Sequence, residues 1–253
     1  MNGAQTAERL WRRAQVCRAN GRLREALAAL IELAGRWPTV EVYTALAQTA
    51  QELEDHSLAY AAYRRALEKD GLHLPALMGL AALHRAQGRE TDAADVYTWA
   101  LKHHPNVPEV HLNLGVSLAR LGHTDEAELC FWNALRLVGK DAPLTGTILY
   151  NLARLYATIE HHAAAISFLL AAASRDTGFA LRACLDDVFL DTSEEPEFRK
   201  VIVLATPQLL RQLSALVVRE GDEALRRFLR ERPILDRAVR SERPFALLRR
   251  HLS

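Results

Sequence analysis

The sequence predicts an all-α protein built as a solenoid of repeated helix pairs, and three observations lead to this prediction. First, alanine recurs at spacings of 33, 34, 34 and 38 residues over the first two thirds of the 253-residue chain. Second, residues at fixed distances from these alanines agree in size from one unit to the next. Third, glycine and proline stand where the helices of such a unit would turn and end. Self-similarity at this period is typical of solenoids.

Each unit carries columns of like residues. Four residues after the repeated alanine stands a large side chain, and twelve residues before it stands a small one. Small residues on both helices let the two axes approach closely, and the large residue fills the gap toward the next unit. The alanines are Ala26, Ala59, Ala93, Ala127 and Ala165; the large residues are Leu30, Tyr63, Tyr97, Phe131 and Leu169; the small residues are Ala14, Ala47, Ala81, Gly115 and Ala153.

Turns and ends are marked in the same register. A tight turn between helices favours glycine five residues before the alanine, and Glu54 and Glu160 occupy that place in units two and five. Pro38 and Pro105 stand twelve residues after their alanines, where the second helix must stop. The turn glycines are Gly21, Gly88 and Gly122.

These columns resemble the tetratricopeptide repeat, a 34-residue helix–turn–helix. The resemblance implies a right-handed superhelical solenoid over residues 1–178, with an atypical first unit in which Leu33 replaces the usual alanine. Before the fifth unit, Gly139–Gly146 is expected to be an extended loop. The five units cover about residues 7–39, 40–73, 74–107, 108–145 and 146–178.

The period fails after Gly178. Residues 179–205 are expected to contain a capping helix, Phe179–Phe189, and an acidic segment similar to the one that closes many tetratricopeptide arrays. Residues 206–253 are expected to form a small basic helical module, because residues 197–253 carry 13 Lys/Arg against 7 Asp/Glu. The net charge of the whole chain is +1, which gives no case for nucleic-acid or membrane binding. The expected helices of the module are Thr206–Arg219, Asp222–Arg232, Pro233–Arg240 and Arg243–Leu252.

No catalytic motif is found, and we expect no enzyme, cofactor or metal. Gly115–Ala119 has the letters of a nucleophile elbow around Ser117 but falls within a repeat helix rather than at a strand-to-helix turn. Adjacent histidines on a helix point about 100° apart, so neither histidine pair offers two ligands to one metal ion. The pairs are His103-His104 and His161-His162; His84 and His111 are expected to pack in the core, and Cys17 and Cys130 to behave as small hydrophobic residues.

The resemblance implies a concave face lined by the first helix of each unit. Asn113 and Asn151 occupy the place from which asparagines in peptide-binding arrays hold an extended backbone, since an amide both donates and accepts. The face also carries five arginines, with only Glu52 and Glu109 near them, which predicts an acidic and apolar peptide or helix as partner. The alternative is that these arginines are merely solvated. The predicted partner-binding residues are Met78, Arg85, Leu112, Asn113, Val116, Arg120, Tyr150, Asn151 and Arg154, and the remaining arginines are Arg12 and Arg18.

A second surface is predicted in the basic module. Its arginines recur at near-helical spacing opposite an apolar face, and they are interpreted as a solvated face, as a dock for the acidic residues 186–197, or as a contact for an anionic partner. They are Arg226, Arg227, Arg230 and Arg237.

The function predicted from these observations is a non-catalytic adaptor or scaffold that binds another protein. The alternatives are a chaperone or assembly factor for one client, a regulatory subunit, and a binder of RNA or membrane surfaces through the basic helices; self-association also stays open. No small-molecule substrate is expected. The N-terminus has no apolar run, and the three cysteines are few and widely spaced, so a cytoplasmic location is expected. The ratio of 28 arginines to 4 lysines suggests a bacterial source.

Overall fold

The computed structural model describes residues 3–139 and 142–252, and within these ranges it contains fourteen α-helices, five short 3₁₀ segments and no strand. The prediction of an all-α chain is confirmed for this part of the molecule. The chain forms two compact units, residues 1–130 and 131–253.

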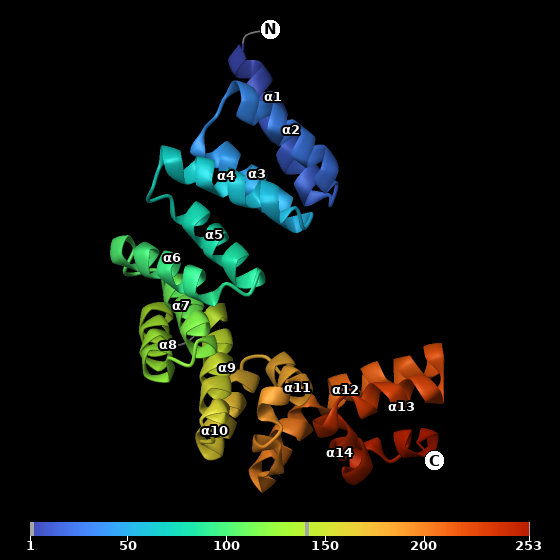
Figure 1. Ribbon diagram of the computed structural model, residues 1–253. Helices are drawn as coiled ribbons and strands as arrows, with labels where there is room; N and C mark the ends of the chain where they lie inside the picture. The colour runs from blue at the N-terminus through green and yellow to red at the C-terminus, as the bar shows by residue number, and fades with distance from the viewer. Residues whose placement is uncertain (1–2, 140–141, 253) are drawn as a thin grey trace. The chain divides into compact units, whose positions relative to one another are not determined.

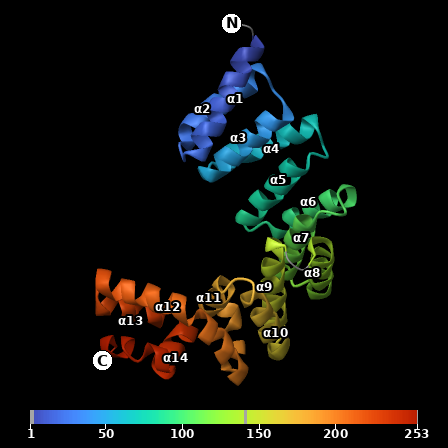
Figure 2. The same cartoon turned by 180° about the vertical axis from the view of Figure 1, so that it is seen from behind.

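The first ten helices alternate as the first and second helix of successive pairs. The two helices pack side by side in the pairs α1–α2, α3–α4, α5–α6 and α9–α10, and Figures 1 and 2 show α3 and α4 antiparallel. In the first unit each pair also packs on the next, through α2 with α3, α4 with α5, and α6 with α7. Their bounds are α1 Gly3–Ala19, α2 Leu23–Arg36, α3 Val40–Glu52, α4 His56–Lys69, α5 Leu74–Ala86, α6 Glu90–His103, α7 Pro108–Arg120, α8 Thr124–Val138, α9 Pro143–Thr158 and α10 His162–Ala173.

The repeated columns form the core of these pairs. All five alanines of the alanine column are 0% exposed, and every member of the large-residue column is at most 1% exposed. The small-residue column of the first helices is also buried throughout. Burial of a fully apolar seam on both helices is what stabilises such a hairpin, because short helices are marginal on their own.

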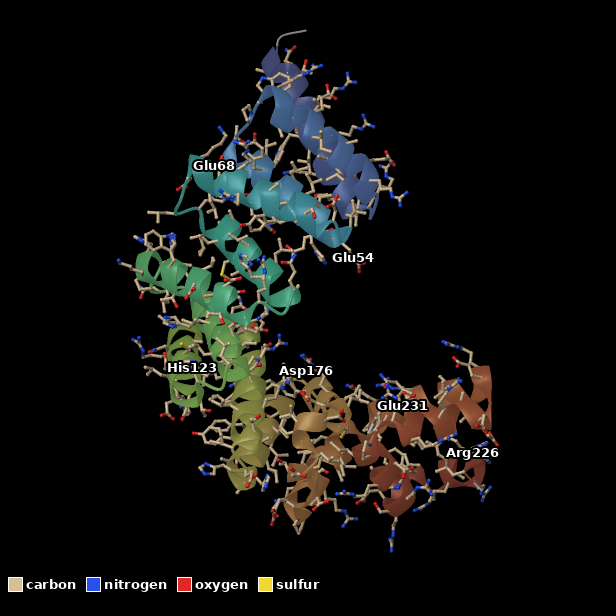
Figure 3. The ribbon with its side chains drawn as sticks, viewed as in Figure 1. Glu54, Glu68, His123, Asp176, Arg226 and Glu231 are labelled. Carbon is tan, nitrogen blue, oxygen red and sulfur yellow. The ribbon has the colours of Figure 1, made fainter. Side chains whose placement is uncertain are left out.

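The turns between paired helices require a left-handed backbone. Gly21, Gly88 and Gly122 have φ values of 71°, 74° and 83°. Glu54 and Glu160 adopt φ values of 61° and 60° in the same place, although their side chains disfavour that conformation. Glu54 lies at the end of the α3–α4 hairpin in Figure 3. The geometry of the turn is therefore imposed by the repeat even where its residue is unsuited to it.

Gly79 marks a close approach between successive pairs. A Cβ atom at this position would lie 2.3 Å from the ring of Tyr63. The Tyr63 hydroxyl lies 3.0 Å from Oε1 of Gln51. Gly79, which also falls at a groove position of the repeat, is thus covered by an aromatic ring of the preceding pair.

Beyond α10 the second unit continues in helices of irregular length around one apolar core, which extends from Tyr150 to Leu248. The core includes Phe189, Phe198 and Phe245, each 0% exposed. The elements are α11 Gly178–Leu185, η1 Asp187–Phe189, η2 Thr192–Glu194, η3 Pro196–Phe198, α12 Arg199–Glu220, α13 Asp222–Arg230, α14 Pro233–Ser241, η4 Arg243–Phe245 and η5 Leu248–His251.

Several predicted boundaries are wrong in this region. The helix expected from Thr206 begins at Arg199, with Pro207 inside it, because Pro207 is exposed and water can replace the missing backbone hydrogen bond there. The capping helix ends at Leu185, since Asp186 leaves the helix and accepts a hydrogen bond from the Val188 amide.

The helix expected over 243–252 is instead two 3₁₀ segments. The loop expected over 139–146 is shorter, because α9 begins at Pro143 with proline at its first position, and residues 140–141 lie outside the described part. The division of the chain into five repeats, a closing segment and a basic module stays a prediction.

Candidate functional site

The predicted partner-binding residues of the first unit lie on α5 and α7. Met78, Val116 and Asn113 are half-buried, so part of each side chain is open to a partner. Leu112 is only 6% exposed and acts mainly in packing. Helical spacing places Met78 with Arg85 on one side of α5, and Asn113 with Val116 on one side of α7.

Arg85 and Asn113 join α5 to α7. Arg85 Nη1 donates to Asn113 Oδ1 at 3.2 Å, which leaves the amide nitrogen of Asn113 without a partner in this bond. Arg85 is half-buried and forms no ion pair with the residues that the structure describes. Among the groove arginines it is therefore the one whose charge is left open to an external carboxylate.

The other groove arginines are paired within the chain. Arg18 Nη2 lies 2.9 Å from Glu52 Oε1, and Arg12 lies 2.6 Å from Glu8. Arg120 Nη1 lies 2.5 Å from Glu90 Oε1. The prediction of a broadly cationic face is therefore too simple, since three of these cations in the first unit already face carboxylates of the same protein. The sequence does not identify Glu90 as a partner of Arg120. Glu90 lies on α6 and Arg120 on α7, and the repeat pattern does not show which side chains of one helix pair reach the next pair.

A buried polar cluster lies beside Arg85. Tyr97 is 0% exposed, and neither its hydroxyl nor the buried Oε2 of Glu90 has a hydrogen-bond partner among the described residues. Burial raises the pKa of Tyr97, while the Arg85 charge lowers it and the Glu90 charge raises it further. The polar network around Arg85 is therefore not closed among the described residues.

The predicted residues of the second unit lie on α9, against the acidic closing segment. The Tyr150 hydroxyl donates to Asp186 Oδ2 at 2.9 Å, and Arg154 Nε lies 3.0 Å from the same oxygen. Tyr150 is only 4% exposed, and burial with the Asp186 charge raises its pKa. Asn151 donates to the Thr147 carbonyl at 2.9 Å, so one of its amide hydrogens is used within its own helix.

A cleft of about 450 Å³ opens at this point of the second unit. The guanidinium of Arg182 lies 5.0 Å from the centre of the Tyr150 ring, within the range of a cation–π contact. Asp186 was not predicted to reach these groove residues, although the acidic segment that contains it was recognised. The cleft is lined by Tyr150, Arg154, Arg182, Leu185, Asp186, Asp187 and Val188.

The basic module does not present its four predicted arginines as one free stripe. Arg226 and Arg230 lie 3.9 Å and 3.3 Å from Glu223 of their own helix (Arg226 is labelled in Figure 3). Arg237 lies 3.3 Å from Glu194 and donates to the Ser193 carbonyl at 3.4 Å, so it docks on the acidic segment. Arg227 is exposed and has no ion pair among the described residues.

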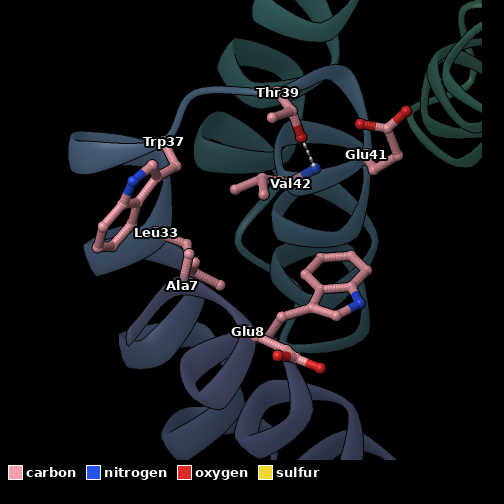
Figure 4. Close-up of a pocket in the computed structure, with 8 residues that line it drawn as sticks. Ala7, Glu8, Leu33, Trp37, Thr39, Glu41 and Val42 are labelled. Atoms are coloured by element: carbon pink, nitrogen blue, oxygen red, sulfur yellow. Dashed lines mark hydrogen bonds between the residues drawn. The ribbon is translucent and has the colours of Figure 1, made fainter. Parts of the chain in front are cut away.

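A second hollow, of about 350 Å³, lies between α1, α2 and α3 (Figure 4). Trp37 stands on one side of it and Glu41 on the other, with Leu33 and Ala7 between them. Thr39 caps α3 by accepting from the Val42 amide at 3.3 Å. The Glu41 pKa is lowered by hydrogen bonds from its own backbone and from Thr39.

The residues considered for chemistry have other surroundings. Ser117 is 0% exposed within α7, where no substrate reaches it. Burial raises the pKa of Cys130 to about 11 and of Cys184 to about 12, so both stay protonated thiols at neutral pH. Across residues 3–139 and 142–252 no three metal-binding side chains come together.

The histidines are used in local contacts. His111 Nε2 bonds the Pro105 carbonyl at 2.9 Å, and His104 Nε2 bonds the Leu72 carbonyl at 2.8 Å. His84 is buried, and the loss of solvation lowers its pKa, as does the nearby Arg89 charge. His103 packs on Trp99, with ring centres 4.5 Å apart. The expectation of core positions for His84 and His111 is confirmed.

Comparison with solved structures shows the same fold in other proteins. A tetratricopeptide repeat protein of Parabacteroides merdae has a TM-score of 0.66 at 17% identity, covering 87% of this chain and 90% of that one. PilF of Pseudomonas aeruginosa has a TM-score of 0.65 at 18% identity, covering 90% and 99%. A thermophilic tetratricopeptide repeat protein of Thermus thermophilus has a TM-score of 0.55 at 23% identity, covering 70% and 96%. At these identities the likeness shows the fold alone.

Family models give the assignment. Three models of the tetratricopeptide repeat match residues 40–70, 74–117 and 106–177, which together make up more than half of the sequence. No curated protein sequence gives a significant match to the chain. These matches agree with the buried columns and the hairpin turns of the structure. The chain therefore belongs to the tetratricopeptide repeat proteins.

Proposed function

We propose that this protein is a non-catalytic, cytoplasmic adaptor that binds a segment of another protein along α5 and α7, and that the segment is acidic and apolar. Repeats of this kind present extended surfaces for binding other proteins. The observation that carries the proposal is the Arg85–Asn113 pair. It places a guanidinium that has no ion pair among the described residues next to the amide nitrogen of Asn113, since the amide oxygen already accepts from Arg85.

The chemistry of the pair defines the segment. An arginine fork binds a carboxylate through paired hydrogen bonds, and the amide nitrogen of Asn113 can donate to a backbone carbonyl. Met78 and Val116, both half-buried on the same helices, offer apolar surface beside the polar pair. A segment with a carboxylate next to an aliphatic or aromatic side chain satisfies both.

The test compares Arg85→Glu and Asn113→Ala with a matched control in affinity capture from native lysate. The control is Arg64→Glu, which reverses an exposed arginine on α4, outside the first-helix face. We expect one stoichiometric protein to be captured by the wild type and the control and lost by Arg85→Glu. Asn113→Ala removes the amide that would hydrogen-bond the backbone of the bound segment, and it is expected to weaken the affinity about tenfold.

Each variant is first checked for unchanged helical circular dichroism and melting temperature, so that loss of capture reports the surface. The captured protein is then cut into overlapping peptides, and their binding is measured calorimetrically. Capture of the same protein at the same yield by wild type and Arg85→Glu would remove this face as the binding site. A bound peptide without any carboxylate would contradict the proposed chemistry.

A further inference from the structure

Helix α12 combines two features that are not explained by the core of the second unit. The segment Pro196–Glu220 is the one stretch within the described residues that is long and apolar enough to cross a membrane. Yet only 28% of the most apolar 18-residue stretch of this segment is buried in the protein. Much of the apolar surface of this helix therefore faces outward.

One face of α12 is fixed in the core. Val201, Ala205 and Leu209 are at most 1% exposed and belong to the same apolar cluster as the helices around them. A helix held in this way cannot cross a bilayer without losing these contacts. Its outward face is the only part open to another surface.

The outward face is apolar and cationic. Val203 is 56% exposed, and Val218, at 88%, is the most exposed large hydrophobic residue that the structure describes. Two cations, Lys200 and Arg211, lie on the same face as these apolar residues. At 3.6 residues per turn its members are Lys200, Val203, Leu204, Pro207, Arg211, Ser214, Ala215 and Val218.

None of the described α12 residues on this face is acidic. The acidic residues nearest in sequence are Glu197, just before the helix, and Glu220, which ends it and pairs with Arg219 at 2.9 Å. Near the start of the helix, Arg199 pairs with Glu242 at 3.1 Å, and an open hollow of about 430 Å³ lies between Pro196, Lys200, Val203 and Leu204. The two charges that the face carries, those of Lys200 and Arg211, are therefore both positive.

We propose that this face binds the surface of an anionic lipid membrane, with α12 lying parallel to the bilayer. Exposed aliphatic side chains such as Val203 and Val218 suit insertion among lipid headgroups, while the long side chains of Lys200 and Arg211 extend to the phosphates. A protein partner would more often fill a pocket with a central anchor surrounded by contacts. Val218 is instead 88% exposed and lines none of the described pockets, so lipid is the better fit.

The test measures binding of the full chain to vesicles of phosphatidylcholine alone and of phosphatidylcholine with phosphatidylglycerol in a two-to-one ratio. We expect sedimentation with the anionic vesicles only, weakened by added salt. Lys200→Glu with Arg211→Glu is expected to reduce binding more than tenfold, since each cation near an anionic surface contributes about fivefold. Val218→Asp is expected to abolish it.

A matched control makes these variants interpretable. Val16→Asp places the same charge at another exposed valine, 53% exposed on α1, and is expected to bind as the wild type does. Because Cys17, Cys130 and Cys184 are buried, Val218→Cys can also be labelled selectively with an environment-sensitive dye. Its emission is expected to shift to shorter wavelength with anionic vesicles, and that of Val16→Cys to stay unchanged.

Three results would overturn the proposal. They are no binding of the wild type to anionic vesicles, binding of Val218→Asp as strong as that of the wild type, and an emission wavelength of the dye on Val218→Cys that does not change with vesicles. If Val218→Asp instead converts a wild-type dimer into a monomer on size exclusion, and vesicles are not bound, the face joins two copies of this chain. These outcomes are independent of Arg85, so they leave the proposed partner site untouched.

Discussion

At the scale of single residues, the turns show where the repeat overrides local preference. Five of the described residues lie in the left-handed region at paired-helix turns, and two of them are glutamates, Glu54 and Glu160. An L-residue in this conformation costs roughly 1–2 kcal/mol, whereas glycine adopts it freely. The buried columns on either side of each turn offset that cost.

Replacement of Glu54 by glycine is therefore expected to stabilise the protein. After the greater entropy of glycine in the unfolded chain is subtracted, we expect a gain of about 0.5–1 kcal/mol in the free energy of unfolding. Melting temperature by circular dichroism is the measurement. The control is Gly88→Ala, which is expected to destabilise by about 1 kcal/mol at the equivalent turn. A lower melting temperature for Glu54→Gly would show that its side chain contributes more than its backbone costs.

At the scale of elements, Asp186 connects the closing segment to the last repeat. Its Oδ1 accepts from the Val188 amide at 3.2 Å and so begins η1, and its Oδ2 contacts Tyr150 and Arg154 of α9. Arg237 holds the same segment from α14 through Glu194. The acidic segment is therefore held by α9 through Asp186 and by α14 through Glu194. The charge of the groove residue Arg154 is already paired with the Asp186 carboxylate of the same chain.

Removal of the Asp186 carboxylate is expected to loosen residues 186–195. Asp186→Ala is expected to lower the free energy of unfolding by about 2 kcal/mol, because it removes the acceptor of the Tyr150 hydroxyl and the carboxylate that forms an ion pair with Arg154. Asp186→Asn retains an acceptor for the Val188 amide and is expected to cost less. Amide hydrogen exchange in this segment is the measurement, and protection equal to wild type in the alanine variant would contradict the assigned role.

At the scale of the whole molecule, the second unit has one core that does not separate repeat from extension. Leu169 of α10, Phe198 before α12 and Phe245 near the C-terminus belong to the same apolar cluster. The last helix pair of a solenoid exposes an apolar side unless further residues cover it. Residues after 178 provide that cover and are part of the fold of this unit.

Truncation after residue 178 is accordingly expected to unfold α9 and α10 rather than leave an intact fifth pair. The shortened chain is expected to bind a hydrophobic dye strongly and to melt over a broad range, while the wild type does neither. Truncation after residue 241, which removes only η4 and η5, is the milder comparison and still deletes Phe245 and Leu248 from the core. A cooperative transition for the 1–178 chain, with helicity in proportion to length, would contradict this interpretation.

The repeat could be predicted from the order of the amino acids alone. Its columns, its turn glycines and the two glutamates in their place all correspond to observed burial or backbone conformation, because the period of a helix pair fixes which residues face the neighbouring helix. The predicted boundaries are less accurate where the sequence has no such period. Helix α12 begins before Thr206, and the helix predicted at the C-terminus is instead two 3₁₀ segments.

Which arginine charges lack a partner became clear from the packing of the helices. Arg18, Arg120 and Arg154 occupy comparable groove faces to Arg85, yet each meets a carboxylate from another helix or from the closing segment. Such pairs form between residues about 30 positions apart, and side-chain reach between helices is not encoded in any periodic pattern. The outward face of α12 was equally hidden, because an apolar run does not show which of its sides is covered until the surrounding helices are in place.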